Sequence, residues 1–268
     1  MSLTVIDWQD FLNKPSGEKS AMTIGVFDGV HIGHIALIER IVKRGPNSTV
    51  ITFRENPKKV IPGSYKGDIY SLKQKLAIFS SMGVQRAVLI DFSREFSKIK
   101  GQDFINLLRE RGGMVFLAIG SDFRCGYRQD TDSNMLREIN ERNGIPTELF
   151  PPVFEPSTAK KRAVSSSRIR AAIYSGNIKL AAELLGRNFG LDLSDLTPEY
   201  RGTKGDLLSG KTGLSGYVYD PGLVHRIAPE SGEYSVLMYP GGIGGLANVE
   251  KGKVSLPNKA ESLEFIGV

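Results

Sequence analysis

The chain has 268 residues, of which 40% are hydrophobic and 24% charged, and its one cysteine excludes an internal disulfide. This is ordinary globular composition, and the length is sufficient for a main domain with a smaller one attached. The formal charge of +6 is uneven, because residues 190–268 contain 7 Lys+Arg against 10 Asp+Glu and residues 1–189 carry +9. The excess favours an anionic partner. Since the basic residues form no dense block or arm, we expect a small polyphosphate and not a nucleic acid.

Membrane insertion and secretion are not expected. The longest apolar runs, such as Val115–Ile119, are far shorter than a membrane span. The N-terminal stretch MSLTVIDWQDFL has neither a basic segment nor a long apolar one, so it is not a secretory signal. The lone Cys125 fits a reducing compartment. We therefore expect a cytoplasmic protein without a membrane partner.

The first two-thirds of the chain alternate strand and helix patterns. Buried apolar runs predict strands at 22–27, 49–53, 87–90, 114–119 and 147–150. Apolar residues at helical spacing predict helices at 33–44, 71–81, 102–111, 165–174 and 178–185. Residues 138–143 are predicted to be the end of a further helix. This alternation predicts an α/β fold with an open parallel sheet covered by helices on both faces, as in Rossmann-like proteins.

After residue 190 the pattern changes to short strands separated by glycine-rich turns. The predicted strands are 214–219, 234–239, 253–256 and 263–266. Short strands of this kind predict a small antiparallel β domain. We therefore divide the chain into a main domain of residues 1–189 and a β-rich domain of residues 190–268.

The first predicted strand and helix are joined by the string G-V-F-D-G-V-H-I-G-H, residues 25–34. In an open parallel sheet, ligands bind where strands end and helices begin. Gly29 and Gly33 let the backbone approach a ligand closely, and the free N–H groups of a helix start favour a phosphate. His31 and His34 are three residues apart and face one side of a helix. Their imidazoles can donate hydrogen bonds to phosphate oxygens.

A structural or a zinc-binding role for the two histidines carries less weight. They could cap a helix or pack in a core, but two of the three histidines in the chain lie in this one glycine-containing loop. They could also bind zinc. However, Cys125 is the only thiol and His225 lies in the other predicted domain, so we expect no protein-held metal site.

H-x-G-H after a first strand resembles the nucleotidyltransferase superfamily related to class I aminoacyl-tRNA synthetases. The longer string G-x-F-D-G-V-H-x-G-H resembles the FMN adenylyltransferase module of bacterial FAD synthetases. The resemblance covers roughly residues 20–189. It continues through Thr52-Phe53 with Pro57, Ser71-Leu72 with Lys75, Gly83-Val84, Asp91-Phe92, Phe104-Ile105, the loop 120–126, the segment 164–170 and Leu184-Leu185-Gly186-Arg187.

The resemblance implies the reaction ATP + FMN giving FAD and pyrophosphate, with Mg²⁺ held largely by the substrate. His31 and His34 would stabilise the α-phosphate and the leaving group. The segment 165–170 matches the family pattern S-S-T-x-x-R, with Ser167 in place of the threonine. By resemblance, its catalytic groups Ser166, Ser167 and Arg170 would hold the β- and γ-phosphates of ATP.

The resemblance also implies a set of nucleotide-binding residues. They are Gly25, Phe27, Asp28, Gly29, Gly33, Asp122 and Ser165. Each polar member has a structural alternative, because serines before a helix are usually N-caps and an aspartate after a strand often forms a turn. Arg168 falls at a variable position of the motif, and we expect a solvated charge or an auxiliary contact there.

Two features depart from the family pattern. Where the family shows F-x-P-H-P in its flavin-binding region, this chain has Phe53-Arg54-Glu55-Asn56-Pro57. The G-x-P-T-A-N motif of the riboflavin kinase barrel is absent from residues 190–268. We therefore expect adenylyl transfer without riboflavin kinase activity, and residues 190–268 as a diverged or degenerate kinase-like barrel.

Two alternatives stay open. A bifunctional enzyme with a diverged kinase would phosphorylate riboflavin with ATP. A non-catalytic flavin-binding protein on the same fold would copurify with FAD and release no pyrophosphate from ATP and FMN, although the paired histidines and the S-S-S-x-x-R string argue against lost catalysis. Related pantetheine-phosphate and nicotinate-mononucleotide adenylyltransferases lack the long histidine-containing string.

Overall fold

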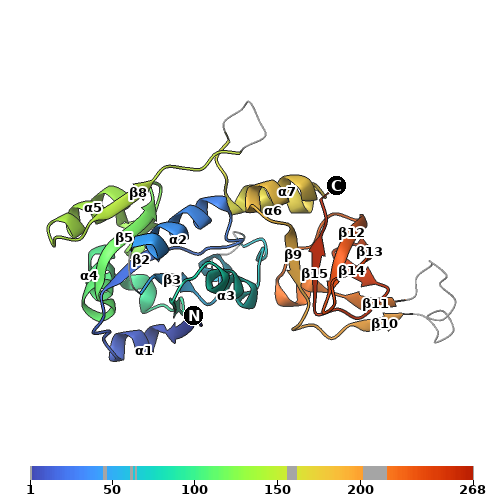
Figure 1. Ribbon diagram of the computed structural model, residues 1–268, viewed down its shortest axis with the longest axis horizontal. Helices are drawn as coiled ribbons and strands as arrows, with labels where there is room; N and C mark the ends of the chain where they lie inside the picture. Colours follow the sequence, from blue (N-terminus) through green and yellow to red (C-terminus); the bar gives the residue numbers. More distant parts are fainter. Residues whose placement is uncertain are drawn as a thin grey trace. The chain divides into compact units, whose positions relative to one another are not determined.

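The computed structural model describes residues 2–44, 47–60, 63, 65–155, 162–201 and 216–267 (Figure 1). The chain forms two compact units, one of Met1–Tyr65 with Lys75–Phe154 and one of Lys66–Gln74 with Glu155–Val268. This division does not coincide with the expected boundary at residue 189, because residues 66–74 and 155–189 belong to the second unit. Whether residues 1–189 fold independently stays a prediction. No helix among the described residues is long and apolar enough to cross a membrane.

The first unit is built on a six-stranded parallel sheet with the strand order β1-β4-β3-β2-β5-β8. Its strands are β1 (Thr4–Asp7), β2 (Ser20–Ile24), β3 (Thr49–Phe53), β4 (Arg86–Ile90), β5 (Met114–Gly120) and β8 (Thr147–Phe150). The helices are α1 (Trp8–Asn13), α2 (Ile32–Arg44), α3 (Leu72–Ser81, whose first turn belongs to the second unit), α4 (Gly101–Gly112) and α5 (Ser133–Glu141). A small hairpin of β6 (Arg124–Cys125) and β7 (Thr131–Asp132) precedes α5.

Helices cover both faces of this sheet, as the sequence predicts (Figure 1). Side chains alternate along a strand, so neighbouring residues of β2 enter different cores. Met22 and Ile24 pack with apolar residues of α1, α4 and α5. Ala21 packs with the core on the other face, which includes Ile38 of α2 and Phe79 of α3. The central strands are buried from both sides, which explains their continuous apolar runs.

The second unit contains a seven-stranded antiparallel sheet with the strand order β10-β11-β14-β13-β12-β15-β9. Its strands are β9 (Phe189–Asp192), β10 (Glu199–Arg201), β11 (Gly216–Tyr219), β12 (Gly232–Tyr239), β13 (Ile243–Glu250), β14 (Lys253–Leu256) and β15 (Ser262–Phe265). The helices α6 (Ser166–Tyr174) and α7 (Ile178–Leu185) precede the sheet in the chain. The expected antiparallel β region is confirmed, while positions 214 and 215 of one expected strand lie outside the described residues.

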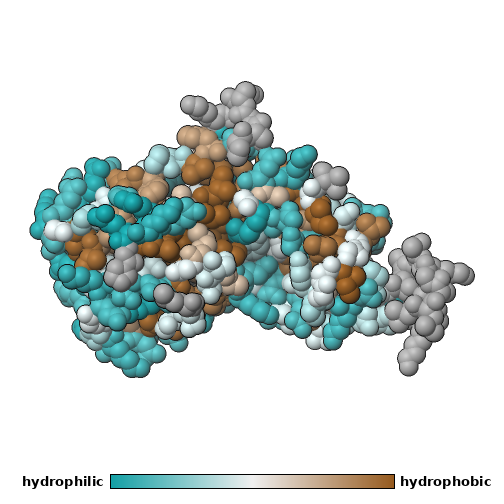
Figure 2. Space-filling view, in the orientation of Figure 1, coloured by the Kyte–Doolittle hydropathy of each residue, from teal (hydrophilic) through white to brown (hydrophobic). Residues whose placement is uncertain are grey.

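The outer surface of the second unit is mixed. Its exposed large hydrophobic side chains include those of Leu223, Ile243 and Leu246. Figure 2 shows hydrophobic residues interspersed with hydrophilic ones on the visible face of this unit. Scattered exposed hydrophobic side chains are normal on protein surfaces.

A buried polar network ties residues 66–74 to the second unit. The Ser71 hydroxyl donates a hydrogen bond to Asp192 at 2.6 Å, and Arg226 donates to the Asp192 carbonyl at 2.7 Å. Burial opposes ionisation of Asp192, but hydrogen bonds from Ser71 and Ser194 and the charge of Arg226 hold the pKa of its carboxyl below the ordinary value. Because the folded-state pKa is lowered, the network stabilises the protein at neutral pH, and this contribution is lost as the pH falls through the folded-state pKa.

Two local differences from the expected elements have clear backbone causes. Strand β2 ends at Ile24 and not at residue 27, because Phe27 has a φ of 52° and cannot continue a strand. Gly244 and Gly245, which lie between the expected strands 234–239 and 253–256, are inside β13 and pair with β12. There the cross-strand hydrogen bonds override the weak strand propensity of glycine.

The end of α4 generates a stability prediction. Gly113 follows the helix with a φ of 63°, and a Cβ atom there would lie 2.2 Å from the Glu18 carbonyl oxygen. Gly144 after α5 has a φ of 70° with nothing within 4 Å of such an atom. We expect Gly144→Ala to lower the free energy of unfolding by about 1–2 kcal/mol, the cost of the left-handed backbone. Gly113→Ala should lower it by about 1–3 kcal/mol more, because the backbone must move.

Chemical denaturation of the two variants measures this difference. Equal losses of stability in Gly113→Ala and Gly144→Ala would contradict the close approach of the Glu18 carbonyl.

Candidate active site

The loop between β2 and α2 holds an unusual backbone. Phe27, Gly29 and Val30 have φ values of 52°, 79° and 40°. Only glycine adopts this region readily, and a β-branched residue such as Val30 is an outlier there. Phe27 and Val30 are both fully buried, and the Phe27 ring packs edge-on against Phe79 of α3 at 5.7 Å. Packing therefore holds the loop in a strained conformation, a feature that clusters at functional sites.

The two histidines of the loop form a stacked pair. The rings of His31 and His34 lie 3.6 Å apart between centroids, at 16° to each other. The edge of the Phe27 ring meets His34 at 5.0 Å. A Cβ atom at Gly33 would lie 3.3 Å from the His31 ring, so glycine at this position leaves room for the stack. The stack thus places two imidazole rings side by side, and their N–H groups can donate hydrogen bonds to one ligand.

Lys75 of α3 holds the start of this loop. The side chain is buried, and its Nζ donates hydrogen bonds to the Val26 carbonyl at 3.4 Å and to the Phe53 carbonyl at 3.2 Å. The Thr52 hydroxyl donates a third hydrogen bond, to the Val26 carbonyl at 3.2 Å. A buried ammonium is costly unless it is hydrogen-bonded, so the two carbonyls stabilise the lysine in its buried position. In return, the lysine holds together the two chain segments at the ends of β2 and β3.

Asp28 and Asp122 lie at the same edge of the sheet. Asp28 is 5% exposed within the histidine loop, and Asp122 is exposed just after β5. Strands β2 and β5 are parallel neighbours, so their carboxyl ends share one edge. The chain runs from β2 to β3 and β4 on one side of β2 and then crosses to β5 on its other side. The carboxyl ends of β2 and β5 are therefore the switch point of the sheet. Ligands of open α/β sheets bind at such switch points.

The segment that departs from the family pattern forms a turn of its own. Asn56 is buried, its side-chain oxygen accepts the Lys58 N–H at 3.1 Å, and its carbonyl accepts the Lys59 N–H at 2.9 Å. It thereby closes the short 3₁₀ helix Pro57–Val60. Asn56 thus has a structural role at the position where the family pattern has histidine.

The serine-rich motif lies at the start of α6 in the second unit. Ser165 is the N-cap, and its hydroxyl accepts the Arg168 N–H at 3.4 Å. Ser166 and Ser167 form the first turn, with Ser167 exposed. Arg170 is buried, and its Nε donates to the Gly67 carbonyl at 2.8 Å. The capping role of Ser165 is therefore real, and it leaves the hydroxyl hydrogen of this serine available.

Arg168 is not the solvated charge that the sequence suggests. Its guanidinium lies 2.6 Å from a carboxylate oxygen of Glu155, a side chain only 2% exposed. A buried carboxylate requires such a partner. Arg168 instead fixes the residue at which the chain enters the second unit, and an auxiliary contact of Arg168 to the phosphates stays a prediction.

The expected site residues thus fall into two groups. In the first unit, the histidine loop brings together Gly25, Phe27, Asp28, Gly29, His31, Gly33 and His34, with Asp122 on the neighbouring strand end. In the second unit, α6 carries Ser166, Ser167 and Arg170 behind the cap Ser165.

Neither a cysteine nucleophile nor a protein-only metal site is supported within the described part of the chain. Burial, with a smaller effect of Asp130, raises the pKa of the Cys125 thiol to about 12, so the reactive thiolate is not formed near neutral pH. No group of three or more His, Cys, Asp or Glu side chains among the described residues could hold a metal ion.

Lys75 is the functional residue that motif analysis undervalued. It enters the resemblance as one matching letter, yet it is the side chain that anchors the histidine loop. Its signal in the sequence is a lysine four residues before the buried Phe79, on the apolar side of an amphipathic helix.

A parallel sheet covered on both faces, with H-x-G-H following its central strand at the switch point, defines a Rossmann-like α/β protein. The sequence model of the FAD synthetase family matches residues 13–168, more than half of the chain. The chain therefore belongs to the FAD synthetase family.

Curated relatives agree with this assignment. The chain is 29% identical to the bifunctional riboflavin kinase/FMN adenylyltransferase of Escherichia coli strain K12 over 186 residues, which cover 67% of this chain and 58% of that protein. The protein of the same name from Buchnera aphidicola (Acyrthosiphon pisum) is 29% identical over 184 residues, 66% of this chain and 58% of its own length. The Bacillus subtilis protein is 26% identical over 227 residues, 82% of this chain and 70% of its own length. The chain thus covers 58% of the length of the first two proteins.

A solved structure shares the fold. The crystal structure of a macrolide-efflux protein from Streptococcus pneumoniae superposes with a TM-score of 0.76 at 21% identity, covering 98% of this chain and 85% of that chain.

The anchoring role of Lys75 is testable without any ligand. Lys75→Met keeps the length of the side chain but leaves the carbonyls of Val26 and Phe53 without this donor. We expect the free energy of unfolding to fall by about 2–4 kcal/mol, the cost of leaving one or two buried acceptors unsatisfied. Hydrogen–deuterium exchange should rise in the peptide that contains residues 25–31.

Lys73→Met is the matched control, because Lys73 is exposed on the same helix and its Nζ bonds the Ser194 hydroxyl at 3.2 Å, far from the histidine loop in the sequence. Unchanged exchange of the histidine loop in Lys75→Met would contradict the role of the lysine.

Proposed function

We propose that this protein is an FMN adenylyltransferase that converts ATP and FMN into FAD and pyrophosphate. The observation that carries the proposal is the stacked pair of His31 and His34 at the switch point of the sheet, in a chain that belongs to the FAD synthetase family. The names of its curated relatives include the same activity. The surplus of positive charge in residues 1–189 suits polyphosphate substrates.

The reaction is a single displacement. An oxygen of the FMN phosphate forms a bond to the α-phosphorus of ATP, while the bond from that phosphorus to the oxygen of the β-phosphate breaks. Pyrophosphate leaves with the electron pair. Such transfers need positioning and neutralisation of charge more than covalent help from the protein. His31 and His34 would donate hydrogen bonds to the α-phosphate oxygens and the leaving group as charge develops.

The rest of the histidine loop would hold the nucleotide. The N–H groups at the start of α2 favour phosphate, and the absence of side chains at Gly29 and Gly33 permits close approach. The remaining expected contacts are those of Gly25, Phe27, Asp28 and Asp122. Because the loop is already strained and packed, it would not have to reorganise when the substrate binds.

The α6 motif would bind the outer phosphates. Ser165, Ser166 and Ser167 supply three hydroxyl groups at a helix start, and Arg170 supplies a positive charge one turn further on. These groups would neutralise the departing pyrophosphate. Mg²⁺ would arrive on the triphosphate and be held mainly by phosphate oxygens and water.

Riboflavin kinase activity is not part of the proposal. The bifunctional relatives carry that name, but the family match ends at residue 168 and no G-x-P-T-A-N string follows in residues 190–268. The proposed partners are therefore the small molecules ATP and FMN, without nucleic acid or membrane. We propose a cytoplasmic location, because a single cysteine without a disulfide partner is typical of a reducing compartment.

The choice of acceptor tests the activity. Purified full-length protein should release pyrophosphate from ATP and Mg²⁺ with FMN, and produce an equal amount of FAD by chromatography. Riboflavin should yield neither FMN nor pyrophosphate. ATP-dependent formation of FMN from riboflavin would instead establish a bifunctional enzyme. FAD bound after purification, with no pyrophosphate from any phosphorylated acceptor, would establish a flavin-binding protein without catalysis.

The histidines have a separate test. We expect His31→Ala and His34→Ala each to lower kcat for adenylyl transfer about a hundredfold or more, as for other preorganised donors to a transition state. Circular dichroism should show an intact fold. His225→Asn, at an exposed left-handed position of the second unit, serves as the control and should keep full activity. Near-normal turnover in either alanine variant removes that histidine from the mechanism.

A further inference from the structure

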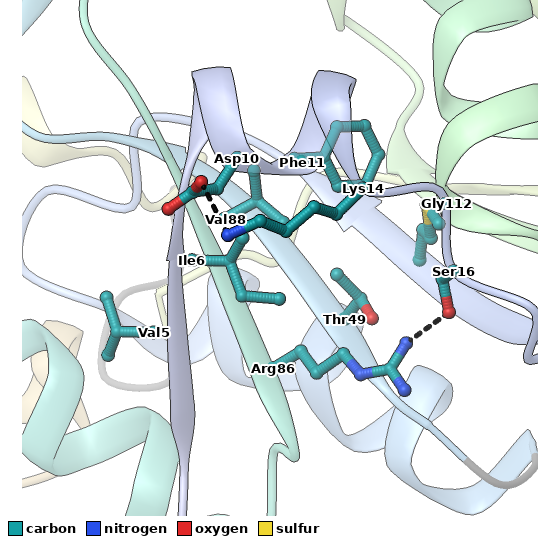
Figure 3. A pocket seen from close by; sticks show the side chains of 11 residues that line it. Val5, Ile6, Asp10, Phe11, Lys14, Ser16, Thr49, Arg86, Val88 and Gly112 are labelled. Carbon is teal, nitrogen blue, oxygen red and sulfur yellow. Dashed lines mark hydrogen bonds and ion pairs between the residues drawn. The ribbon is translucent and has the colours of Figure 1, made fainter.

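A cavity lies in the first unit, away from the histidine loop. It encloses about 280 Å³ beneath α1 (Figure 3). Thr49 and Arg86, the first residues of β3 and β4, line it together with Gly112 at the end of α4. These positions mark the amino edge of the sheet, whereas the histidine loop leaves the carboxyl edge. The cavity is therefore separate from the proposed site of adenylyl transfer.

Part of the cavity wall is apolar. Val5, Ile6 and Phe11 keep some exposed surface there, whereas Met22 and Val88, which also line it, are fully buried. At about 30 Å³ for each water in the liquid, the volume corresponds to roughly nine water molecules, enough for a ring or a short alkyl chain. Moving such an apolar body from water onto these walls is favourable in proportion to the apolar area removed from water.

Two cations lie at the rim. Figure 3 shows the Arg86 guanidinium directed toward Ser16, and Lys14 extending over the cavity toward Asp10. Arg86 donates to the Ser16 hydroxyl at 2.9 Å and also bonds Glu18. A guanidinium has five N–H donors, so Arg86 keeps donors that no described residue of the protein accepts from. Lys14 forms an i,i+4 pair with Asp10, a weak interaction on an exposed helix surface.

Exposure decides which charge a ligand meets. The side chains of Asp10 and Glu18 are 56% and 60% exposed, so water screens their charges. Lys14 is 78% exposed and is screened as well, whereas Arg86 is only 20% exposed. A charge-assisted hydrogen bond to a partly buried guanidinium is stronger than one in water. The rim therefore favours an anionic group over a cationic one.

We propose that this cavity binds a small amphipathic carboxylate, with its apolar body on Val5, Ile6 and Phe11 and its carboxylate on Arg86 and Lys14. Arg86 would share its guanidinium between Glu18 and this carboxylate, which would accept from the N–H groups that Ser16 and Glu18 do not use. The site is independent of the proposed adenylyl transfer, since none of these residues belongs to the histidine loop or to the α6 motif.

The only tryptophan of the chain provides a direct readout. Trp8 stacks on Phe11 with 5.3 Å between ring centroids, and Phe11 lines the cavity. Titration of the full-length protein with benzoate or octanoate should give a saturable change in Trp8 fluorescence. Benzyl alcohol and octanol, which match the probes in shape without the charge, should bind at least about tenfold more weakly, the loss expected for a charged hydrogen bond.

Two variants separate the charge from the fold. Arg86→Gln should weaken benzoate binding about tenfold and change benzyl alcohol binding less than about twofold. Lys14→Gln, at an exposed position that cannot disturb the core, should weaken benzoate alone by a smaller factor. Arg109→Gln, a partly exposed α4 residue outside the cavity, is the control and should change neither. ATP and FMN should leave the benzoate signal unchanged, because they are expected at the other edge of the sheet.

Three results would overturn the proposal. The first is the absence of a saturable fluorescence change and of any thermal shift with millimolar benzoate and octanoate. The second is equal binding of carboxylates and alcohols, unaffected by Arg86→Gln and Lys14→Gln. The third is displacement of benzoate by ATP or FMN, which would place the probe at the histidine loop.

Discussion

The position of β2 in the middle of the parallel sheet is the constraint on which the site depends. From β2 the chain continues to β3 and β4 on one side and later forms β5 on the other side, so no crossover connection links the neighbouring strands β2 and β5 directly. The loop that follows β2 therefore lies at the switch point, and its base is fixed by a strand that is buried on both faces. The rigid strand and the close packing of the loop together allow strain at Phe27 and Val30 to persist.

Lys75 converts this topology into a defined geometry. Its buried ammonium donates hydrogen bonds to the carbonyl groups of both Val26 and Phe53, at the ends of two neighbouring strands. Phe27 then packs under His34, and Gly33 leaves space for the ring of His31. Each of these contacts constrains the next. The paired imidazoles are thus positioned by the packing and hydrogen bonds of neighbouring residues, which is how preorganised sites are generally supported.

The strands and helices that are buried on regular faces could be predicted from the sequence. Strands β3 and β8 agree residue for residue with expectation, because periodicity reports burial directly. Strand β1 escaped prediction because it is mostly exposed, and β13 because glycines interrupt its alternation. The partners of Lys75 lie 22 and 49 residues away in the chain, and no local pattern encodes such contacts. The histidines could be found by motif, but the 3.6 Å stack between their rings could not.

Residues 66–74 belong to the second unit although they interrupt the first in the sequence. This arrangement affects both the folding of the chain during synthesis and the exchange of its units in evolution. Ile69 and Tyr70 are almost fully buried there, and Tyr70 stacks on Phe189, more than a hundred residues later. During synthesis this short segment emerges early and must wait for most of the chain before its partners exist. No single cut of the polypeptide, and no single gene fusion point, separates the two units intact. They therefore cannot be exchanged between proteins as simple modules, and sequence changes on one side of the interruption must remain compatible with the other.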